Sequence, residues 1–157
     1  MPFLKESDLK EADEIIQLDV QAIEDEMGEK YRGFLYGQFM ATAKGVKVIE
    51  YNVRLGDPEA INMMALLSTD AAKLMEAIAF GKLDENLVGF TPKCLLCKYL
   101  VPAAYPEKKE QIDVDLDMNA IQEEGFSVIF ASIVENEKAL RTLGSRTLAV
   151  VGLGEQI

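Results

Sequence analysis

The chain has 157 residues, of which 49% are hydrophobic and 27% are charged, a composition typical of folded globular proteins rather than disordered ones. It has 27 Asp and Glu residues against 16 Lys and Arg residues, which gives a formal net charge of -11. Such an acidic surface repels phosphate backbones and anionic lipids, so we expect no nucleic-acid partner and no membrane partner. A nucleotide is still compatible with this charge, because a metal ion and a few local cations can neutralise one phosphate cluster.

Neither an export signal nor a membrane-spanning segment is expected. The N-terminal residues MPFLKESDLK contain acids and no apolar signal-peptide core, and no window reaches the roughly 18 apolar residues needed to span a bilayer. The two cysteines, Cys94 and Cys97, do not form the disulfide framework of a secreted domain. We therefore expect a cytoplasmic protein.

The chain contains no histidine, which restricts its chemistry. It cannot build a Ser-His-Asp or Cys-His nucleophile, or a His-ligated zinc site, from its own residues. Carboxylate, amide and cation chemistry remains, and these groups suit hard metal ions and phosphates.

A long helix and a pair of strands are expected first along the chain. Apolar residues recur at spacings of three and four over residues 7–27, which predicts a helix with Ser7 as its N-cap and Gly28 as its stop. Residues 33–54 are predicted to form two strands joined by a short turn near Ala43-Lys44-Gly45.

Two shorter helices are expected next, followed by β structure. Asp57-Pro58-Glu59 predicts a helix start, and the apolar run INMMALL follows it. Ser68-Thr69-Asp70 begins a further helix that stops near Gly81. From about residue 90, strands are predicted in four segments: PKCLLCKYLVP, EQIDVDLD, FSVIFASIV and SRTLAVVGLG.

These elements predict an α+β chain in two parts. Residues 1–88 carry the helices and the strand pair, and residues 89–157 form a small β-rich, barrel-like domain. Both ends are abrupt, which leads us to expect a piece of a larger chain whose last domain is incomplete at its C-terminus.

The predicted strand over residues 48–54 has an unusual polar face. Successive strand side chains point to opposite faces, so alternate residues form two rows. One row is apolar and suits a core: Ile49, Tyr51 and Val53. The other row holds an acid, an amide and a cation: Glu50, Asn52 and Arg54.

Glu50 and Asn52 are the best candidates for chemistry, because two oxygen-bearing side chains two residues apart on a strand converge on one point. Such a pair suits Mg²⁺, which favours one or two carboxylate-type ligands completed by water and substrate phosphates. Arg54, on the same face, could meet a phosphoryl group. The alternative is a solvated strand face with a cross-strand ion pair. A three-residue turn would place Gln38 across from Glu50 on this face, whereas a two-residue turn would place them on opposite faces.

Three other motifs favour structural roles. Asp57 is predicted to cap the helix that follows it. Cys94 and Cys97 fall on opposite faces of a strand and have no second pair, so core packing is favoured over redox or zinc chemistry. Met63-Met64 is predicted to fill the core.

Four segments, in order, resemble the phosphoribosylamine–glycine ligase family (glycinamide ribonucleotide synthetases) of the ATP-grasp superfamily: GFLYGQFM, KVIEYNVRLGDPEA, KYLVPAAYP and SRTLAVVGLG. The resemblance runs over nearly the whole chain and is most specific from Gly33 to Glu59. It implies the C-terminal half of an ATP-grasp domain, an antiparallel sheet with helices, followed by a small C-terminal domain. Leu55 departs from the usual Phe and Ala104 from the usual Gly before Tyr-Pro, and both are mild packing changes.

The resemblance implies an ATP-dependent ligase of purine biosynthesis that joins glycine to phosphoribosylamine and forms ADP and phosphate. It implies Glu50 and Asn52 as ligands of Mg²⁺ or Mn²⁺ and Gln38 as a further ligand. Arg54 is then a catalytic residue that balances charge on the transferring phosphoryl group or the acyl phosphate.

The nucleotide-covering lobe and the phosphoribosylamine-binding domain of that family have no counterpart in this sequence. We therefore expect the 157-residue chain alone to be inactive. The alternative is a noncatalytic module for assembly or regulation, which could form a homodimer through exposed apolar surface.

Overall fold

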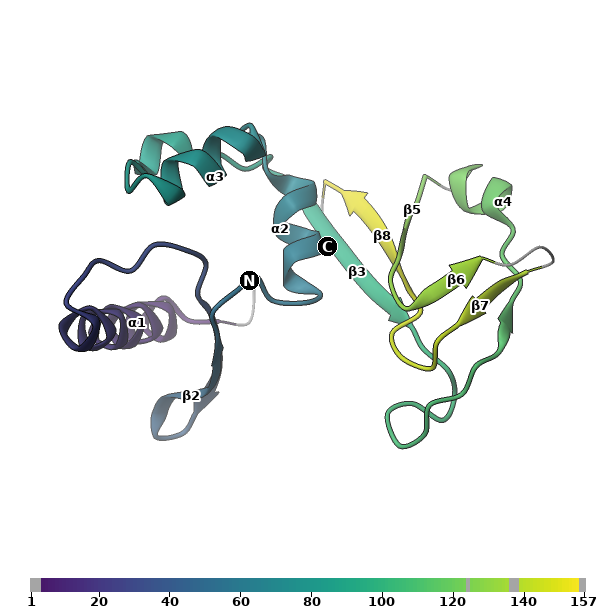
Figure 1. Cartoon of the computed structure of the whole chain (residues 1–157), viewed down its shortest axis with the longest axis horizontal. Coiled ribbons are helices and arrows are strands. Elements are labelled where there is room, and N and C mark those ends of the chain that lie inside the picture. The colour runs from purple at the N-terminus through teal and green to yellow at the C-terminus, as the bar shows by residue number, and fades with distance from the viewer. Residues whose placement is uncertain (1–3, 124, 136–138, 156–157) are drawn as a thin grey trace. The chain divides into compact units, whose positions relative to one another are not determined.

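In the computed structural model of the chain, the structure describes residues 4–123, 125–135 and 139–155. The elements run from α1 to β8 along the chain (Figure 1) and divide into two compact units. The first unit extends to Ala60 and resumes over Leu67–Gly89. The second comprises Ile61–Leu66 and the chain from Phe90 onward.

The first unit begins with the predicted long helix, α1 (Glu6–Met27). Its end at Gly28 is confirmed, because Gly28 adopts a left-handed conformation with φ of 72° and its N–H donates to the Glu24 carbonyl at 2.8 Å. The N-cap is wrong: it is Lys5, whose backbone N–H donates to the Asp8 carboxylate at 3.2 Å. An acid in the first turn thus satisfies the cap residue where Ser7 was expected to cap the helix.

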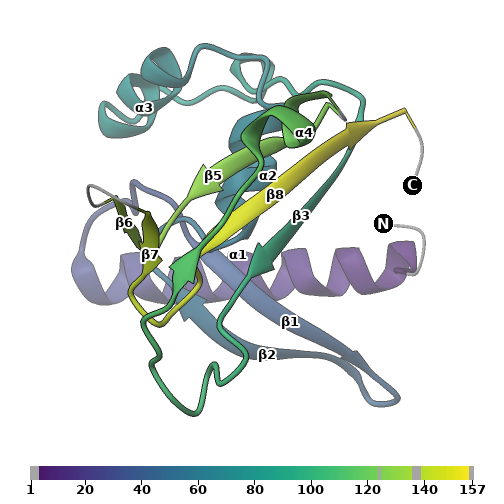
Figure 2. The same cartoon turned by 90° about the vertical axis from the view of Figure 1, so that its right-hand side faces the viewer.

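The predicted strand pair is an antiparallel hairpin of β1 (Tyr36–Thr42) and β2 (Gly45–Asn52). α1 packs against this hairpin (Figure 2), and Val46 of β2 is buried there with an exposed fraction of 3%. Two residues of the predicted apolar row are not covered, since Ile49 is 50% exposed and Val53 is 77% exposed. The prediction that they line a core is wrong for this chain.

The remaining helix of the first unit is α3 (Ala71–Ala79), followed by a short 3₁₀ helix, η1 (Glu85–Leu87). The predicted start of α3 is confirmed, because the Asp70 side chain accepts hydrogen bonds from the N–H groups of Ala72 and Lys73 at 2.9 and 3.2 Å. Leu74 of α3 is buried, and Gly81 follows the helix with φ of 62°.

Helix α2 (Glu59–Leu66) forms where it was predicted, but it begins differently. Its N-cap is Pro58, which makes no side-chain cap hydrogen bond, so the prediction of Asp57 as the N-cap is wrong by one residue. Met64 is 39% exposed, so the prediction of core packing also fails for this residue of the Met63-Met64 pair.

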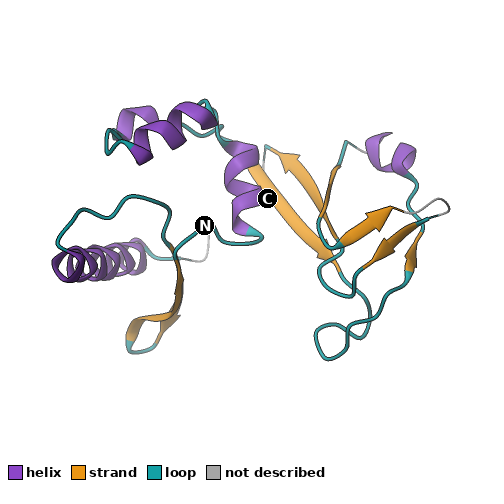
Figure 3. Cartoon of the chain, in the orientation of Figure 1, coloured by secondary structure: helices purple, strands orange, loops and turns teal. Residues whose placement is uncertain are grey.

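The second unit contains two antiparallel three-stranded sheets (Figure 3). The first has the order β3-β8-β5, formed by Cys94–Leu100, Leu148–Gly154 and Ser127–Phe130. The second has the order β4-β7-β6, formed by Asp113–Val114, Leu140–Thr142 and Ile133–Glu135. Strand β8 carries the core of this unit, with Leu148, Ala149 and Val151 buried.

Mixed helix and antiparallel sheet are therefore confirmed, but a closed barrel is not, because the described strands form two separate sheets. Strand β7 and helix α4 (Met118–Glu123) were not predicted, and FSVIFASIV forms two strands rather than one. Cys94 and Cys97 are not joined by a disulfide, and each is half-buried in β3. In the described ranges, no helix combines the length and apolarity that crossing a bilayer requires.

Candidate metal and phosphate site on strand β2

The turn of the hairpin is one residue shorter than the three-residue turn that was expected to pair Gln38 with Glu50. Thr42 pairs with Gly45, so the turn consists of the two residues Ala43 and Lys44. The Thr42 hydroxyl donates to the Gly45 carbonyl at 2.7 Å and accepts from the Lys44 N–H at 3.1 Å, which holds this tight turn together. A regular hairpin with such a turn would place Gln38 and Glu50 on opposite faces.

A β-bulge restores the expected pairing. Phe39 pairs with Val48, but the next pair is Gln38 with Glu50, so β2 has one extra residue, Ile49, between them. The bulge supplies the residue that the turn lacks. Gln38 therefore lies directly across from Glu50, although the turn has two residues and not the three that this pairing was expected to need.

Tyr51 anchors the inner face of the hairpin on α1. Its hydroxyl donates to Asp19 Oδ2 at 2.6 Å, and its ring meets the Phe39 ring edge to face with 6.1 Å between centroids. Burial, this hydrogen bond and the Asp19 charge raise the pKa of Tyr51 to about 12. Because strand side chains alternate, Glu50 and Asn52 on either side of Tyr51 point to the outer face.

Hydrogen bonds between their terminal groups join the three polar side chains of the outer face, Glu50, Asn52 and Arg54. Asn52 Nδ2 donates to Glu50 Oε1 at 2.9 Å, and Arg54 Nη2 donates to Asn52 Oδ1 at 3.0 Å. The second guanidinium nitrogen, Nη1, donates to the Leu55 carbonyl at 2.8 Å. The structure thus brings the acid, the amide and the cation together, as the alternation in the sequence predicted.

Tyr36 extends this polar face, because it pairs with Asn52 across the hairpin. Its hydroxyl donates to Glu59 Oε1 at 3.0 Å. Burial, the hydrogen bond to Glu59, and the negative charges of Glu59 and Glu50 raise the pKa of Tyr36. Gly56 is buried beside this pair, and an added Cβ there would lie 2.6 Å from Glu59 Oε2 and 2.9 Å from the Tyr36 ring.

Our sequence reasoning did not select Tyr36 or Glu59. The signal for Tyr36 was present, since it lies two residues before Gln38 and strand alternation puts both on one face. No comparable signal exists for Glu59, because its contact with Tyr36 joins residues 23 positions apart.

The donor atoms of the row fit a small, hard divalent cation. Two oxygens bound side by side to Mg²⁺ at about 2.1 Å lie about 3 Å apart. The Asn52 amide nitrogen lies 2.9 Å from Glu50 Oε1, so a turn of the amide group would bring its oxygen to a similar distance. In the described part of the chain, no cluster of three or more Asp, Glu, Cys or His side chains could hold a metal ion. A metal here would therefore depend on one carboxylate, amide oxygens such as that of Gln38, and oxygens of water and substrate.

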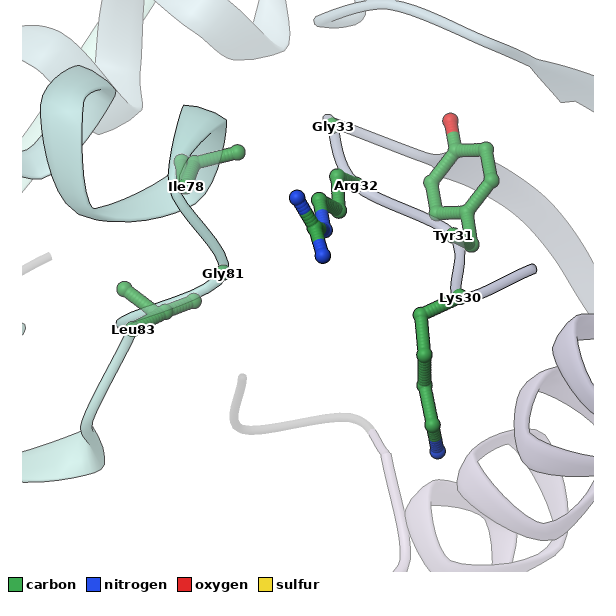
Figure 4. Close-up of a pocket in the computed structure, with 7 residues that line it drawn as sticks. All are labelled: Lys30, Tyr31, Arg32, Gly33, Ile78, Gly81 and Leu83. Atoms are coloured by element: carbon green, nitrogen blue, oxygen red, sulfur yellow. The ribbon is translucent and has the colours of Figure 1, made fainter.

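The first unit also has a cavity that is lined by none of the residues of the polar row, Glu50, Asn52 and Arg54. The cavity in Figure 4 has a volume of about 260 Å³ and lies between the loop after α1 and the segment after α3. Lys30 and Arg32 come from the first segment, and Ile78, Gly81 and Leu83 from α3 and the second. The Arg32 guanidinium lies against Gly81, where an added Cβ would be 3.1 Å from Nε. This cavity takes no part in the polar row.

Residues 1–60, which include the hairpin and the polar row, match the model of the phosphoribosylglycinamide synthetase ATP-grasp (A) domain. The hairpin and its polar row therefore lie in a segment that is similar to the ATP-grasp class of domain. Over the whole chain, the similarity is to phosphoribosylamine–glycine ligases, and the resemblance inferred from the sequence is confirmed.

Two curated relatives illustrate the extent of the match. The chain is 43% identical over 157 residues to phosphoribosylamine–glycine ligase of Methanosarcina barkeri, of which it covers 36%. It is 45% identical over 158 residues to that of Methanococcus maripaludis, of which it covers 35%. The crystal structure of the ligase from Thermotoga maritima aligns with 99% of this chain and 38% of its own length, with a TM-score of 0.76 and 28% identity. The chain thus spans little more than a third of the length of its relatives.

Proposed function

We propose that this chain forms part of an ATP-dependent ligase that joins glycine to 5-phosphoribosylamine, with formation of ADP and phosphate, in de novo purine biosynthesis. The observation that carries the proposal is the convergence of Glu50, Asn52 and Arg54 on one face of a hairpin whose sequence matches an ATP-grasp domain. In the relatives, the printed name specifies both the amine and the amino acid that are joined.

Glu50 and Asn52 would hold Mg²⁺ or Mn²⁺, and Gln38 would add an amide oxygen from the neighbouring strand. A bound cation would neutralise charge on the phosphate oxygens of ATP. Arg54 would supply a second positive charge to the transferring phosphoryl group, or to the acyl phosphate of glycine that the amine then attacks. Phosphoryl transfer depends on positioning and charge neutralisation, so a chain without histidine can contribute fully to it.

The organisation proposed for the chain follows the same comparison. Residues 1–88 would belong to the C-terminal half of an ATP-grasp domain, and residues 89–157 to a small barrel-like domain. The enzyme would be cytoplasmic, like other enzymes that use soluble metabolites as substrates.

Glycine-dependent ADP release by the 157-residue chain tests the proposed division of the active site. We expect none, because the chain spans about 36% of the length of such a relative. Robust turnover by this chain would show that the substrate-binding groups have been wrongly placed outside it.

Metal binding tests the site itself. In a Mn²⁺ titration without nucleotide, Glu50→Ala should weaken binding at least tenfold, because it removes the only carboxylate of the row. Glu14→Ala is the matched control, since it removes an exposed carboxylate of α1 that pairs with Lys10 and lies outside the hairpin. Equal Mn²⁺ affinity of wild type and Glu50→Ala would show that the metal site has been wrongly assigned.

A noncatalytic module is the second candidate, and exposed apolar surface in the second unit favours it. Leu96 and Leu153 are 73% and 56% exposed, and both line a cavity of about 450 Å³ on the β3-β8-β5 sheet. Such a surface could join two copies of the chain into a homodimer. Analytical ultracentrifugation, together with the Mn²⁺ titration, distinguishes the two candidate functions. A stable dimer that does not bind Mn²⁺ favours the module, and a monomer that binds Mn²⁺ favours the ligase fragment.

A further inference from the structure

The amide oxygen of Asn52 is already in use in the metal-free chain. It accepts a hydrogen bond from Arg54 Nη2 at 3.0 Å, while the amide nitrogen donates to Glu50 Oε1 at 2.9 Å. Arg54 is held in this position by its second nitrogen, which donates to the Leu55 carbonyl at 2.8 Å. The planar guanidinium therefore bridges a side-chain oxygen and a backbone oxygen as a rigid fork.

We propose that Arg54 is a latch on the metal site: it occupies the Asn52 oxygen in the metal-free chain and is released when a divalent cation binds, which frees the guanidinium for a phosphoryl group. This inference rests on the metal site proposed above. It adds an order of events, because the two N–H groups that now bond to Asn52 and Leu55 become available to an anion only after the cation binds.

The geometry explains why both contacts of Asn52 must break. For Asn52 to present its oxygen beside Glu50, the amide group has to turn by about half a rotation, because its nitrogen faces Glu50 now. The same rotation turns the amide nitrogen toward Arg54, so that one hydrogen-bond donor would face another. A divalent charge in the site also repels the guanidinium. Arg54 must therefore leave Asn52.

The surroundings of Arg54 permit this movement. Arg54 is exposed, and Val53 before it is 77% exposed, so release displaces no buried group. By contrast, the neighbouring Gly56 is buried against Tyr36 and Glu59. The side chain can thus swing while the backbone that carries it stays in place.

Mn²⁺ titration of the 157-residue chain, without nucleotide, tests the latch. Arg54→Lys keeps the positive charge but loses the fork, and Arg54→Leu loses both. Each should bind Mn²⁺ about threefold to tenfold more tightly than wild type, which is the worth of one hydrogen bond that no longer has to break. Lys47→Gln is the matched control for charge, since Lys47 lies on the same strand and outside the row. We expect it to change the affinity less than about twofold at 0.15 M salt.

Glu50→Ala, measured in parallel, separates failure of the latch from failure of the site. If Glu50→Ala weakens binding but Arg54→Lys binds like wild type, the site stands and the latch is wrong. The latch is also wrong if Arg54→Leu and Lys47→Gln both raise the Mn²⁺ affinity by the same factor while Arg54→Lys does not. Loss of one positive charge would then explain the gain. If Glu50→Ala binds Mn²⁺ like wild type, the proposed metal site and the latch are both wrong.

Nuclear magnetic resonance gives a readout that is independent of affinity. Inorganic phosphate alone should move the signals of the Arg54 Nη1 and Nη2 nitrogens little, because both nitrogens already donate to protein oxygens. After saturation with Mg²⁺, these signals should move, and added phosphate should then move them again. An equal response to phosphate with and without Mg²⁺ would overturn the proposed order.

Discussion

Deletion of Ile49 tests the role of the bulge in shaping the polar face. Without Ile49, Val48 and Glu50 become neighbours, so the pairs of Phe39 with Val48 and Gln38 with Glu50 continue in one regular ladder. The polar face should therefore survive the loss of a residue from the middle of its strand. In a regular strand, the same deletion would move all later side chains to the opposite face.

The expected change in stability is small. Full burial of an Ile side chain is worth about 1.5–3 kcal/mol, and Ile49 is 50% exposed, so its removal costs about 1 kcal/mol. The regular ladder regains at most one hydrogen bond, worth about 0.5–1.5 kcal/mol. The lost burial and the regained hydrogen bond cancel to within about 1 kcal/mol. The midpoint of urea unfolding should therefore shift by less than about 1 M.

Deletion of Tyr51 is the matched control, because it shortens the same strand beyond the bulge. It moves Asn52 to the inner face and removes the hydrogen bond to Asp19, so we expect a loss of at least about 2 kcal/mol and no Mn²⁺ binding. Urea unfolding followed by circular dichroism, together with a Mn²⁺ titration, measures both effects. The reasoning is refuted if the chain without Ile49 stays folded but loses Mn²⁺ binding, or if it is as unstable as the chain without Tyr51.

Other contacts lead to further predictions. Tyr51→Phe should destabilise the chain by about 1 kcal/mol in urea unfolding, because it removes the hydrogen bond to Asp19. The raised pKa of Tyr51 means that the folded chain favours the protonated phenol, so this contribution is present below pH 10 and is lost as the pH rises toward 12; Tyr51→Phe should remove that decline. Asp70→Ala should cost about 1 kcal/mol in the same assay through loss of the α3 cap, whereas Asp70→Asn should cost little; equal losses would contradict a capping role. Gly56→Ala should lower the melting temperature through a loss of about 1–3 kcal/mol, because its Cβ would lie 2.9 Å from the half-buried Tyr36 ring; an unchanged melting temperature would contradict this crowding.

Local signals in the sequence were sufficient for the presence of α1, α2 and α3 and for the composition of the polar row. Helix α1 follows from the spacing of its apolar residues, and its end at Gly28 follows from the left-handed conformation that glycine adopts easily. The start of α3 follows from Asp70, whose side chain satisfies N–H groups two and three residues ahead. Alternation alone places Glu50 and Asn52 on one face, because no bulge lies between them.

The tertiary structure alone decided which residue faces that pair. Val46 is buried and lines the same cavity as Leu9 and Ala12 of α1, and Tyr51 hydrogen-bonds to Asp19 of the same helix. Val46 and Tyr51 are five positions apart, an odd number, so a regular strand would point them to opposite faces. Packing both against one helix requires one extra residue between them, and that residue creates the bulge which puts Gln38 across from Glu50. Because this requirement comes from contacts with a distant helix, no pattern within the strand could have revealed it.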